Sequence, residues 1–167
     1  MDDPGQGTTN RETPVWADLV RESGPEEGSA VASRLVLTAL QLEEVVAHCL
    51  RAFPEEGCGL LAGDPSTGKV LRVFPTANAS RSSRVYTVDP RDLLRADRES
   101  EAAGMVILGV FHSHTHTDPY PSPTDVDQAP DPGWHYVLVS LRDELASLRS
   151  YRIAGGAVTE ETVAVEG

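Results

Sequence analysis

The sequence predicts an α+β domain in which a mixed central sheet is packed by helices. Two apolar stretches, residues 58–63 and 105–111, are hydrophobic on both faces, which is typical of strands that are covered on two sides. Residues 39–53 and 90–103 carry helix capping signals at their ends. Because these helices and strands do not alternate in a regular βαβ order, a doubly wound fold is not expected.

The chain length and composition predict one folded domain with an acidic tail. The 167 residues accommodate a single domain, and an apolar content of 40% is sufficient for its core. Residues 1–33 carry seven acidic residues against two arginines and few apolar ones, so residues 1–34 are expected to be disordered. The domain is expected to span residues 35–167, and a short apolar cluster at residues 15–20 is assigned no function.

The charge and cysteine content exclude several classes of protein. A net charge of −12, from 26 acidic and 14 basic residues, argues against a nucleic-acid or anionic membrane surface, because both need a positive patch. Two cysteines, Cys49 and Cys58, are too few for a disulfide framework. Since neither a membrane span of about 20 apolar residues nor a secretion signal is visible, we expect a cytoplasmic protein.

The first half of the domain contains a capped helix followed by a buried strand. Residues 35–37 are typical of a strand, and Thr38 with Gln41 forms a capping-box pattern. Pro54 ends the following helix, and Glu56 precedes the apolar strand at residues 58–63. The apolar residues of the helix form one stripe that is expected to lie on the sheet: Leu42, Val45, Val46, Cys49, Leu50 and Phe53.

The second half of the domain is expected to alternate between strands, turns and two capped helices. Asp89-Pro90 begins the helix that Gly104 ends, and Ser122-Pro123 begins a short helix with Asp125 in its first turn. Gly155-Gly156 indicates a hairpin turn. Strands are predicted at residues 70–74, 85–88, 105–111, 135–141, 148–153 and 158–165, with a turn at 64–69.

The chemistry is concentrated at the end of the apolar strand that leads into His112-Ser113-His114. Two histidines at i and i+2 on a strand point to the same face, so both imidazoles can bind one ion. Asp125 can supply a third ligand, and two nitrogens with one oxygen suit Zn²⁺ and leave a position for water. A carboxylate beside that water must move its proton, and Glu56 is the best candidate.

These residues resemble the JAMM metallopeptidase family. The match consists of His112-Ser113-His114, seven residues, Ser122, two residues and Asp125, together with the upstream strand Glu56-Gly57-Cys58-Gly59-Leu60-Leu61-Ala62-Gly63. The resemblance covers residues 35–165 and implies the JAMM/MPN fold, which is related to the cytidine deaminase sheet. It implies one zinc ion per chain on His112, His114 and Asp125. It also implies that Glu56 is the general base and acid, and that Ser122 helps stabilise the oxyanion.

Several roles have an alternative interpretation from the residues alone. Ser122 is equally well explained as a helix N-cap. Glu55 competes with Glu56 for the role of base, and the family pattern favours Glu56. Asn78 could hold the backbone of a substrate, although a loop asparagine more often has a local structural role. His116 is expected at the surface because three ligands already complete the set.

Within the family, the chain is most similar to bacterial members that act on small ubiquitin-like sulfur carrier proteins. Residues 135–140, 148–153 and 156–161 carry this similarity. It implies hydrolysis of the amide bond at the C-terminal Gly-Gly of such a carrier, with release of cysteine for cysteine biosynthesis. An isopeptidase that removes a ubiquitin-like modifier and a non-catalytic MPN scaffold are the alternatives. Pairing into a homodimer is left open, and no role is assigned to His48 or His135.

Overall fold

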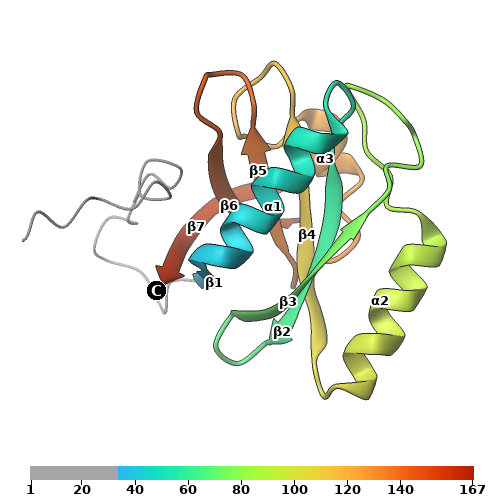
Figure 1. Cartoon of the computed structure of the whole chain (residues 1–167), viewed down its shortest axis with the longest axis vertical. Coiled ribbons are helices and arrows are strands. Elements are labelled where there is room, and N and C mark those ends of the chain that lie inside the picture. The colour runs from blue at the N-terminus through green and yellow to red at the C-terminus, as the bar shows by residue number, and fades with distance from the viewer. Residues whose placement is uncertain (1–33) are drawn as a thin grey trace, which may run out of the picture.

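The computed structural model describes residues 34–167, and most of the expected acidic tail, with its apolar cluster at 15–20, lies outside them. Figure 1 shows the arrangement of the helices and strands. Their bounds are β1 Arg34–Thr38, α1 Ala39–Ala52, β2 Cys58–Asp64, β3 Lys69–Thr76, α2 Pro90–Ala102, β4 Val106–His114, α3 Pro123–Asp127, β5 His135–Ser140, β6 Ser147–Ala154 and β7 Ala157–Glu166.

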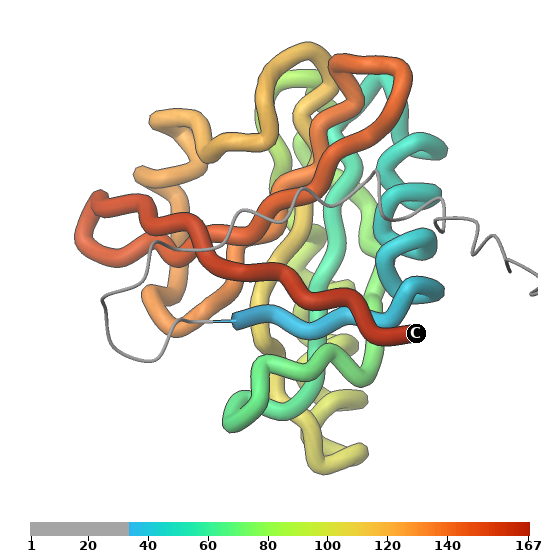
Figure 2. Tube along the Cα trace, turned by 90° about the vertical axis from the view of Figure 1, so that its left-hand side faces the viewer, coloured from blue at the N-terminus to red at the C-terminus, as the bar shows by residue number. Residues whose placement is uncertain are grey.

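The strands form a mixed sheet that closes on itself in the order β1-β3-β2-β4-β5-β6-β7. Strand β4 pairs antiparallel with β2 and parallel with β5. The closure is made by β1, which runs parallel to β7 over five residue pairs and has one parallel pair with β3, between Val36 and Lys69. Figure 2 shows β1 in blue beside β7 in red. The prediction of an α+β domain with a mixed sheet is confirmed.

The central strands are covered on both faces by separate hydrophobic clusters. Leu61 and Phe111 pack with the buried residues of α1 on one face. Leu60 and Val110 pack with Ala96 of α2 on the other. Because successive side chains of a strand point to opposite faces, strands in this position need apolar residues throughout. This explains why the two continuous apolar stretches of the sequence are β2 and β4.

The helix ends follow the predicted capping signals. Thr38 and Gln41 form the capping box of α1, and the Asp89 side chain accepts the N–H of Arg91 at the start of α2. Gly104 has a φ of 73° just after α2, a conformation that favours glycine. In residues 34–167 we find no helix of sufficient length and apolar character to cross a membrane.

The apolar stripe of α1 is shorter than predicted. Leu42, Val45, Val46 and Cys49 are buried, whereas the side chains of Leu50 and Phe53 are 56% and 48% exposed. Leu50 lies about 80° from Leu42 around the helix axis, at the edge of the stripe. Phe53 is the C-cap residue, with ψ of 134°, and so lies beyond the last helical turn.

The strand predicted at residues 85–88 is wrong. The segment that follows β3 contains an isolated bridge between Asn78 and Val88, and otherwise forms a loop. The Asn78 side chain accepts the N–H groups of Ser80 and Thr87 and donates to the carbonyl of Val85. A buried side-chain amide thus takes the backbone partners that a neighbouring strand would otherwise supply.

The close approach of β4 to β5 requires a glycine at position 109. A Cβ atom there would lie 2.0 Å from the carbonyl oxygen of His135, which is a backbone atom and cannot swing away. We expect Gly109→Ala to lower the free energy of unfolding by about 2–3 kcal/mol, the upper part of the usual range of about 1–3 kcal/mol for forced overpacking. Urea unfolding measures this change.

Gly133→Ala is the matched control, because its added Cβ would meet a side-chain oxygen of Asp131 at 3.1 Å. That variant is expected to stay within about 0.5 kcal/mol of the wild type. Equal unfolding midpoints for Gly109→Ala and Gly133→Ala would contradict the close approach.

Candidate metal centre

Strand β4 carries both candidate histidine ligands. His112 pairs with Cys58 on β2 and with Leu138 on β5, and His114 pairs with Ser140 on β5. Both side chains are buried and project from the same face of β4, as alternate residues of a strand must. Because the strand is paired on both edges at His112, the sheet determines the backbone position and the face from which that side chain projects.

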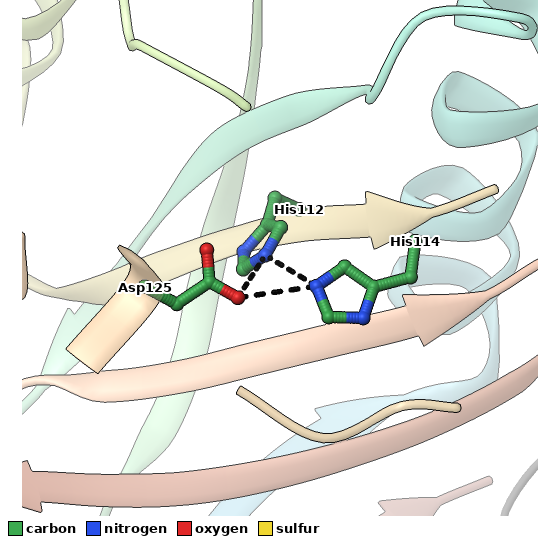
Figure 3. A group of neighbouring side chains, drawn as sticks. All are labelled: His112, His114 and Asp125. Carbon is green, nitrogen blue, oxygen red and sulfur yellow. Dashed lines mark hydrogen bonds and ion pairs between the residues drawn. The ribbon is translucent and has the colours of Figure 1, made fainter. Parts of the chain in front are cut away.

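The third candidate ligand comes from the first turn of α3. Ser122 is the N-cap residue, and its side chain accepts the N–H of Asp125 at 3.1 Å. In return, Oδ2 of Asp125 accepts the N–H of Ser122 at 2.8 Å. The same oxygen lies 3.3 Å from Nε2 of His112 and 3.1 Å from Nε2 of His114 (Figure 3). The capping box therefore aims the carboxylate at the two imidazoles.

The three converging atoms fit a small tetrahedral cation. They can hold a metal ion together, and the two Nε2 atoms are 3.2 Å apart. A tetrahedral ion with bonds of about 2.0–2.1 Å has ligands about 3.3 Å apart, close to all three separations. Nδ1 of His114 lies 2.9 Å from the carbonyl oxygen of Asp118, which can only accept. In the neutral ring Nδ1 therefore carries the hydrogen, so that once Nε2 has lost its own proton to a metal its lone pair can serve as the ligand.

Electrostatics favour the ligand form of His112 and Asp125, but not that of His114. Burial lowers the pKa of His112, so its imidazole is neutral at pH 7. Burial alone would raise the pKa of Asp125, but hydrogen bonds from His112 and His114 outweigh it and hold the pKa well below its usual range. Burial also opposes protonation of His114, but the hydrogen bonds to Asp125 and to the Asp118 carbonyl leave its pKa raised. A metal would have to displace only that proton.

Glu56 lies between α1 and β2, close enough to the cluster to interact electrostatically with His114 and Asp125. Its side chain is buried, and its Oε2 atom has no hydrogen-bond partner among residues 34–167. Burial, aided by the charge of Asp125 and opposed by that of His114, raises the pKa of Glu56 to about 7. Glu55 is partly exposed. A buried carboxylate without a partner is unfavourable unless it serves a bound group.

The other residues singled out in the sequence lie in different surroundings. His116 is exposed, as expected, with its ring edge-on to that of Phe53 at 6.2 Å. Asn78 is buried and makes five hydrogen bonds within the chain. Ser122 has the predicted N-cap geometry.

Sequence reasoning missed three residues that support the site and the sheet. The Tyr86 ring stacks on the His112 ring at 4.1 Å between centroids. His48 Nε2 lies within hydrogen-bond distance of the Cys58 and Thr76 carbonyl oxygens, which ties α1 to β2 and β3. His135 is buried and lies 2.5 Å from Glu161. An aromatic residue within the polar loop was the available signal for Tyr86, whereas the partners of the two histidines are distant in sequence.

A cavity of about 480 Å³ borders the loop that joins β4 to α3. Its lining includes Asp118 and Tyr120 of that loop and Arg142 and Arg149 of the region around β6. The carbonyl of Asp118 also contacts Nδ1 of His114, so the cavity and the candidate ligand share this one residue. Its volume is within the range of small-molecule binding pockets, about 300–1,000 Å³.

Comparisons with known proteins found a matching family and several similar proteins. Residues 38–154 match a family described as prokaryotic homologs of the JAB domain. The chain is 47% identical over 132 residues to the CysO-cysteine peptidase of Mycobacterium tuberculosis, covering 78% of this chain and 90% of that protein. It is 42% identical over 89 residues to a probable TtuB-protein conjugate cleaving protease of Thermus thermophilus, covering 53% of this chain and 58% of that protein.

A solved structure is also similar over most of its length. The solution structure of protein DSY2949 from Desulfitobacterium hafniense aligns with a TM-score of 0.73 and 36% identity, covering 79% of this chain and 92% of that one.

The raised pKa of Glu56 predicts a pH-dependent difference between the metal-free wild type and Glu56→Gln. From the usual pKa of 4.5 to about 7, folded Glu56 retains a proton that the unfolded chain releases. Rising pH therefore destabilises the wild type through this group. Because glutamine does not titrate, the free energy of unfolding of the variant minus that of the wild type should increase between pH 4.5 and about 7, and then level off.

Urea unfolding of chelator-treated protein between pH 4.5 and 8 measures this difference. The titrations of His112, His114 and Asp125 occur in both proteins, and the difference therefore reports Glu56 together with its coupling to His114 and Asp125. A difference that does not change with pH would mean that the pKa of Glu56 is not raised.

Proposed function

Because this chain belongs to the family of prokaryotic homologs of the JAB domain and is a JAMM-type hydrolase, we propose that it is a zinc peptidase of carrier-protein adducts. Its substrate is the amide bond at the C-terminal Gly-Gly of a small ubiquitin-like sulfur carrier protein, and its product is free cysteine. The observation that carries this proposal is the convergence of His112, His114 and Asp125 beside the buried carboxyl group of Glu56.

His112, His114 and Asp125 are the residues that would hold the zinc ion. Bound zinc supplies Lewis acidity, which makes water a nucleophile at neutral pH and polarises a carbonyl group. The protein contributes the orientation of its ligands. The hydrogen bond between Nδ1 of His114 and the Asp118 carbonyl holds one ring, and the stacked Tyr86 ring holds the other.

Glu56 is proposed to move the proton of the reaction. Its carboxylate accepts a proton from the attacking water and donates it to the nitrogen of the leaving amine as the carbon–nitrogen bond breaks. A pKa of about 7 suits both steps, because the group then takes and returns a proton near neutral pH. The free Oε2 atom is available for this task.

Ser122 is proposed to donate a hydrogen bond to the oxyanion that develops on the substrate carbonyl. Its Oγ atom accepts the N–H of Asp125, so its own hydroxyl hydrogen remains available to a second group. The two interpretations of Ser122, helix cap and oxyanion donor, are therefore compatible. A donor of this kind typically changes the rate by about 10²–10³-fold.

The similarity to the CysO-cysteine peptidase supports a carrier–cysteine adduct as the substrate. The volume of the cavity beside the Asp118 loop suits an amino acid or a short peptide, and we propose that it receives the leaving amine. A second candidate is an isopeptidase that removes a ubiquitin-like modifier from proteins. The relative named a conjugate cleaving protease supports it. A non-catalytic scaffold is disfavoured because the four central residues of the motif are all present and lie together.

We expect the zinc-loaded protein to release cysteine from a Gly-Gly-terminated carrier–cysteine adduct. We expect this reaction to be faster than cleavage of the same carrier linked to a lysine side chain, because a cavity of about 480 Å³ suits a group of the size of an amino acid. Mass spectrometry of both adducts over time measures the two rates. Faster cleavage of the lysine adduct would favour the isopeptidase, and cleavage of neither adduct would overturn the proposal.

Glu56→Gln is expected to lower kcat at least about 10²-fold, because it removes the group that moves the proton. Elemental analysis should still find one zinc per chain in this variant, since Glu56 is not a ligand. Glu55→Gln is the matched control and should retain wild-type kcat. Wild-type kcat in Glu56→Gln, or its loss in Glu55→Gln, would show that Glu56 is not the base.

Ser122→Gly separates the two roles of Ser122. Glycine is tolerated at an N-cap position at a cost of only a few tenths of a kcal/mol, but it has no hydroxyl group. We expect kcat to fall about 10²-fold with zinc content and thermal midpoint nearly unchanged, because only the oxyanion donor is lost. Ser122→Thr retains both functions and is the control. Full activity of Ser122→Gly would restrict the role of Ser122 to capping α3.

A further inference from the structure

The hydrogen bonds that hold Glu56 in place are made by its backbone N–H and carbonyl groups and not by its carboxyl group. Residues 53–57, which contain it, form neither helix nor strand, so no ladder of hydrogen bonds determines its position. Its side-chain Oε2 atom has no partner among the described residues. The backbone N–H of Glu56 donates to the carbonyl of Ser82 at 2.8 Å, and its own carbonyl accepts Nδ2 of Asn78 at 3.0 Å. Both anchors belong to residues 78–88, which we call the anchoring loop.

Asn78 organises the anchoring loop as well as contacting Glu56. Its Nδ2 group lies within hydrogen-bond distance of the carbonyls of Glu56, Ser82 and Val85, at 3.0, 3.4 and 3.0 Å. Its Oδ1 atom accepts the N–H groups of Ser80 and Thr87, at 3.0 and 3.1 Å. The carbonyls can only accept and the N–H groups can only donate, so one orientation of the amide fits all five contacts, with the two Nδ2 hydrogens shared among three carbonyls.

Hydrogen bonds connect Glu56, Ser82 and Asn78 in a ring. Ser82 receives a hydrogen bond from the N–H of Glu56 and a second one from Asn78, which in turn holds the carbonyl of Glu56. Arg81, just before Ser82, has a φ of 45°, an unfavourable conformation for a side chain other than glycine. Its N–H donates to the carbonyl of Asn78, which closes the turn. Such a conformation persists only where its surroundings hold it.

We propose that Asn78 is a positioning residue for Glu56, an inference that rests on the proposed role of Glu56 as the base. The side chain of Asn78 is 8% exposed, and its amide is saturated by bonds within the chain. A substrate backbone would have to displace one of those bonds to reach it. Asn78 therefore affects the reaction by fixing the backbone position from which the Glu56 side chain extends. Displacement of a catalytic group by about 1 Å can lower a rate about 10²-fold.

Asn78→Asp tests this proposal with little change in side-chain size. Aspartate keeps an oxygen for the N–H groups of Ser80 and Thr87, but it turns an acceptor toward the three carbonyls. With the carrier–cysteine adduct, we expect kcat to fall about 10–10²-fold while KM stays within about twofold of the wild type. Zinc content should remain one per chain. Asn78→Ala, which introduces no charge, should change kcat in the same direction if Asn78→Asp does not fold.

Ser80→Ala is the matched control from the same loop. The Ser80 hydroxyl is paired with the Thr87 hydroxyl at 2.7 Å in an exposed position, and this hydroxyl makes no hydrogen bond to Glu56 or Asn78. Wild-type kcat is expected in this variant. An equal loss of kcat in Ser80→Ala and Asn78→Asp would assign the effect to general loosening of the loop and overturn the proposal.

A double-mutant cycle separates positioning from direct substrate binding. If Asn78 acts through Glu56, Asn78→Asp should lower the single-turnover rate of Glu56→Gln by no more than about twofold. If Asn78→Asp lowers the single-turnover rate of Glu56→Gln by the same factor as that of the wild type, Asn78 is a substrate-binding residue and the proposal is refuted. A raised KM with unchanged kcat would have the same meaning. Wild-type kinetics of Asn78→Asp would also refute it.

Amide hydrogen exchange gives a readout that does not depend on activity. The N–H of Glu56 should exchange at least about tenfold faster in Asn78→Asp than in the wild type, because the Ser82 carbonyl loses its own support. The N–H of Gly57, which donates to Ser113 Oγ, should be much less affected. If the wild type cleaves no adduct, the proposed function fails, and unchanged exchange at Glu56 separately refutes the anchoring.

Discussion

The double pairing of β4, antiparallel to β2 and parallel to β5, is the constraint on which the rest of the site depends. Hydrogen bonds on both edges hold the strand up to its last residues, where polar side chains replace apolar ones. His112 and His114 therefore leave a rigid frame on one face, and Asp118 and Tyr86 of two neighbouring loops hold their rings. Ser113, between them, points to the opposite face and accepts the N–H of Gly57, which joins the ligand strand to the segment of the base.

The third candidate ligand, Asp125, is positioned by the capping box of α3, which also stabilises the start of that helix. In a capping box, the side chain at the third helical position accepts the N–H of the N-cap residue. Asp125 does this for Ser122 with Oδ2, and the same oxygen faces both histidines. The beginning of α3 is thus stabilised by the atom that completes the cluster. Loss of the capping geometry would misplace the carboxylate, so helix formation and ligand placement are coupled.

Burial governs the chemistry of the site. Hydrogen bonds to two imidazoles keep Asp125 ionised, whereas desolvation raises the pKa of Glu56, whose Oε2 atom lacks a partner. Two carboxyl groups of the same site are thereby given different proton affinities, which suits one to binding and the other to proton transfer. The anchoring loop then has to hold Glu56 through its backbone, because any strong partner for the carboxyl group would compete with its proposed task.

The sequence alone determined the parts of this protein that depend on local pattern. The capping signals at Thr38, Asp89 and Ser122, the Gly155-Gly156 hairpin and the two buried central strands all have their causes within a few residues. The motif spacing also named the residues that the structure brings together as a possible metal cluster. These predictions are accurate because capping and hydrophobic alternation are short-range effects.

Tertiary structure decided what depends on contacts between distant segments. Closure of the sheet by β1 and β7, the contact of His135 with Glu161 and the stacking of Tyr86 on His112 join residues far apart in the chain. The predicted strand at 85–88 failed because the side chain of Asn78 takes its backbone partners. That same competition made a loop asparagine the anchor of Glu56. No local pattern shows that a side chain will replace a neighbouring strand as the backbone's hydrogen-bond partner, since the free energy of that replacement depends on burial, which only the folded chain provides.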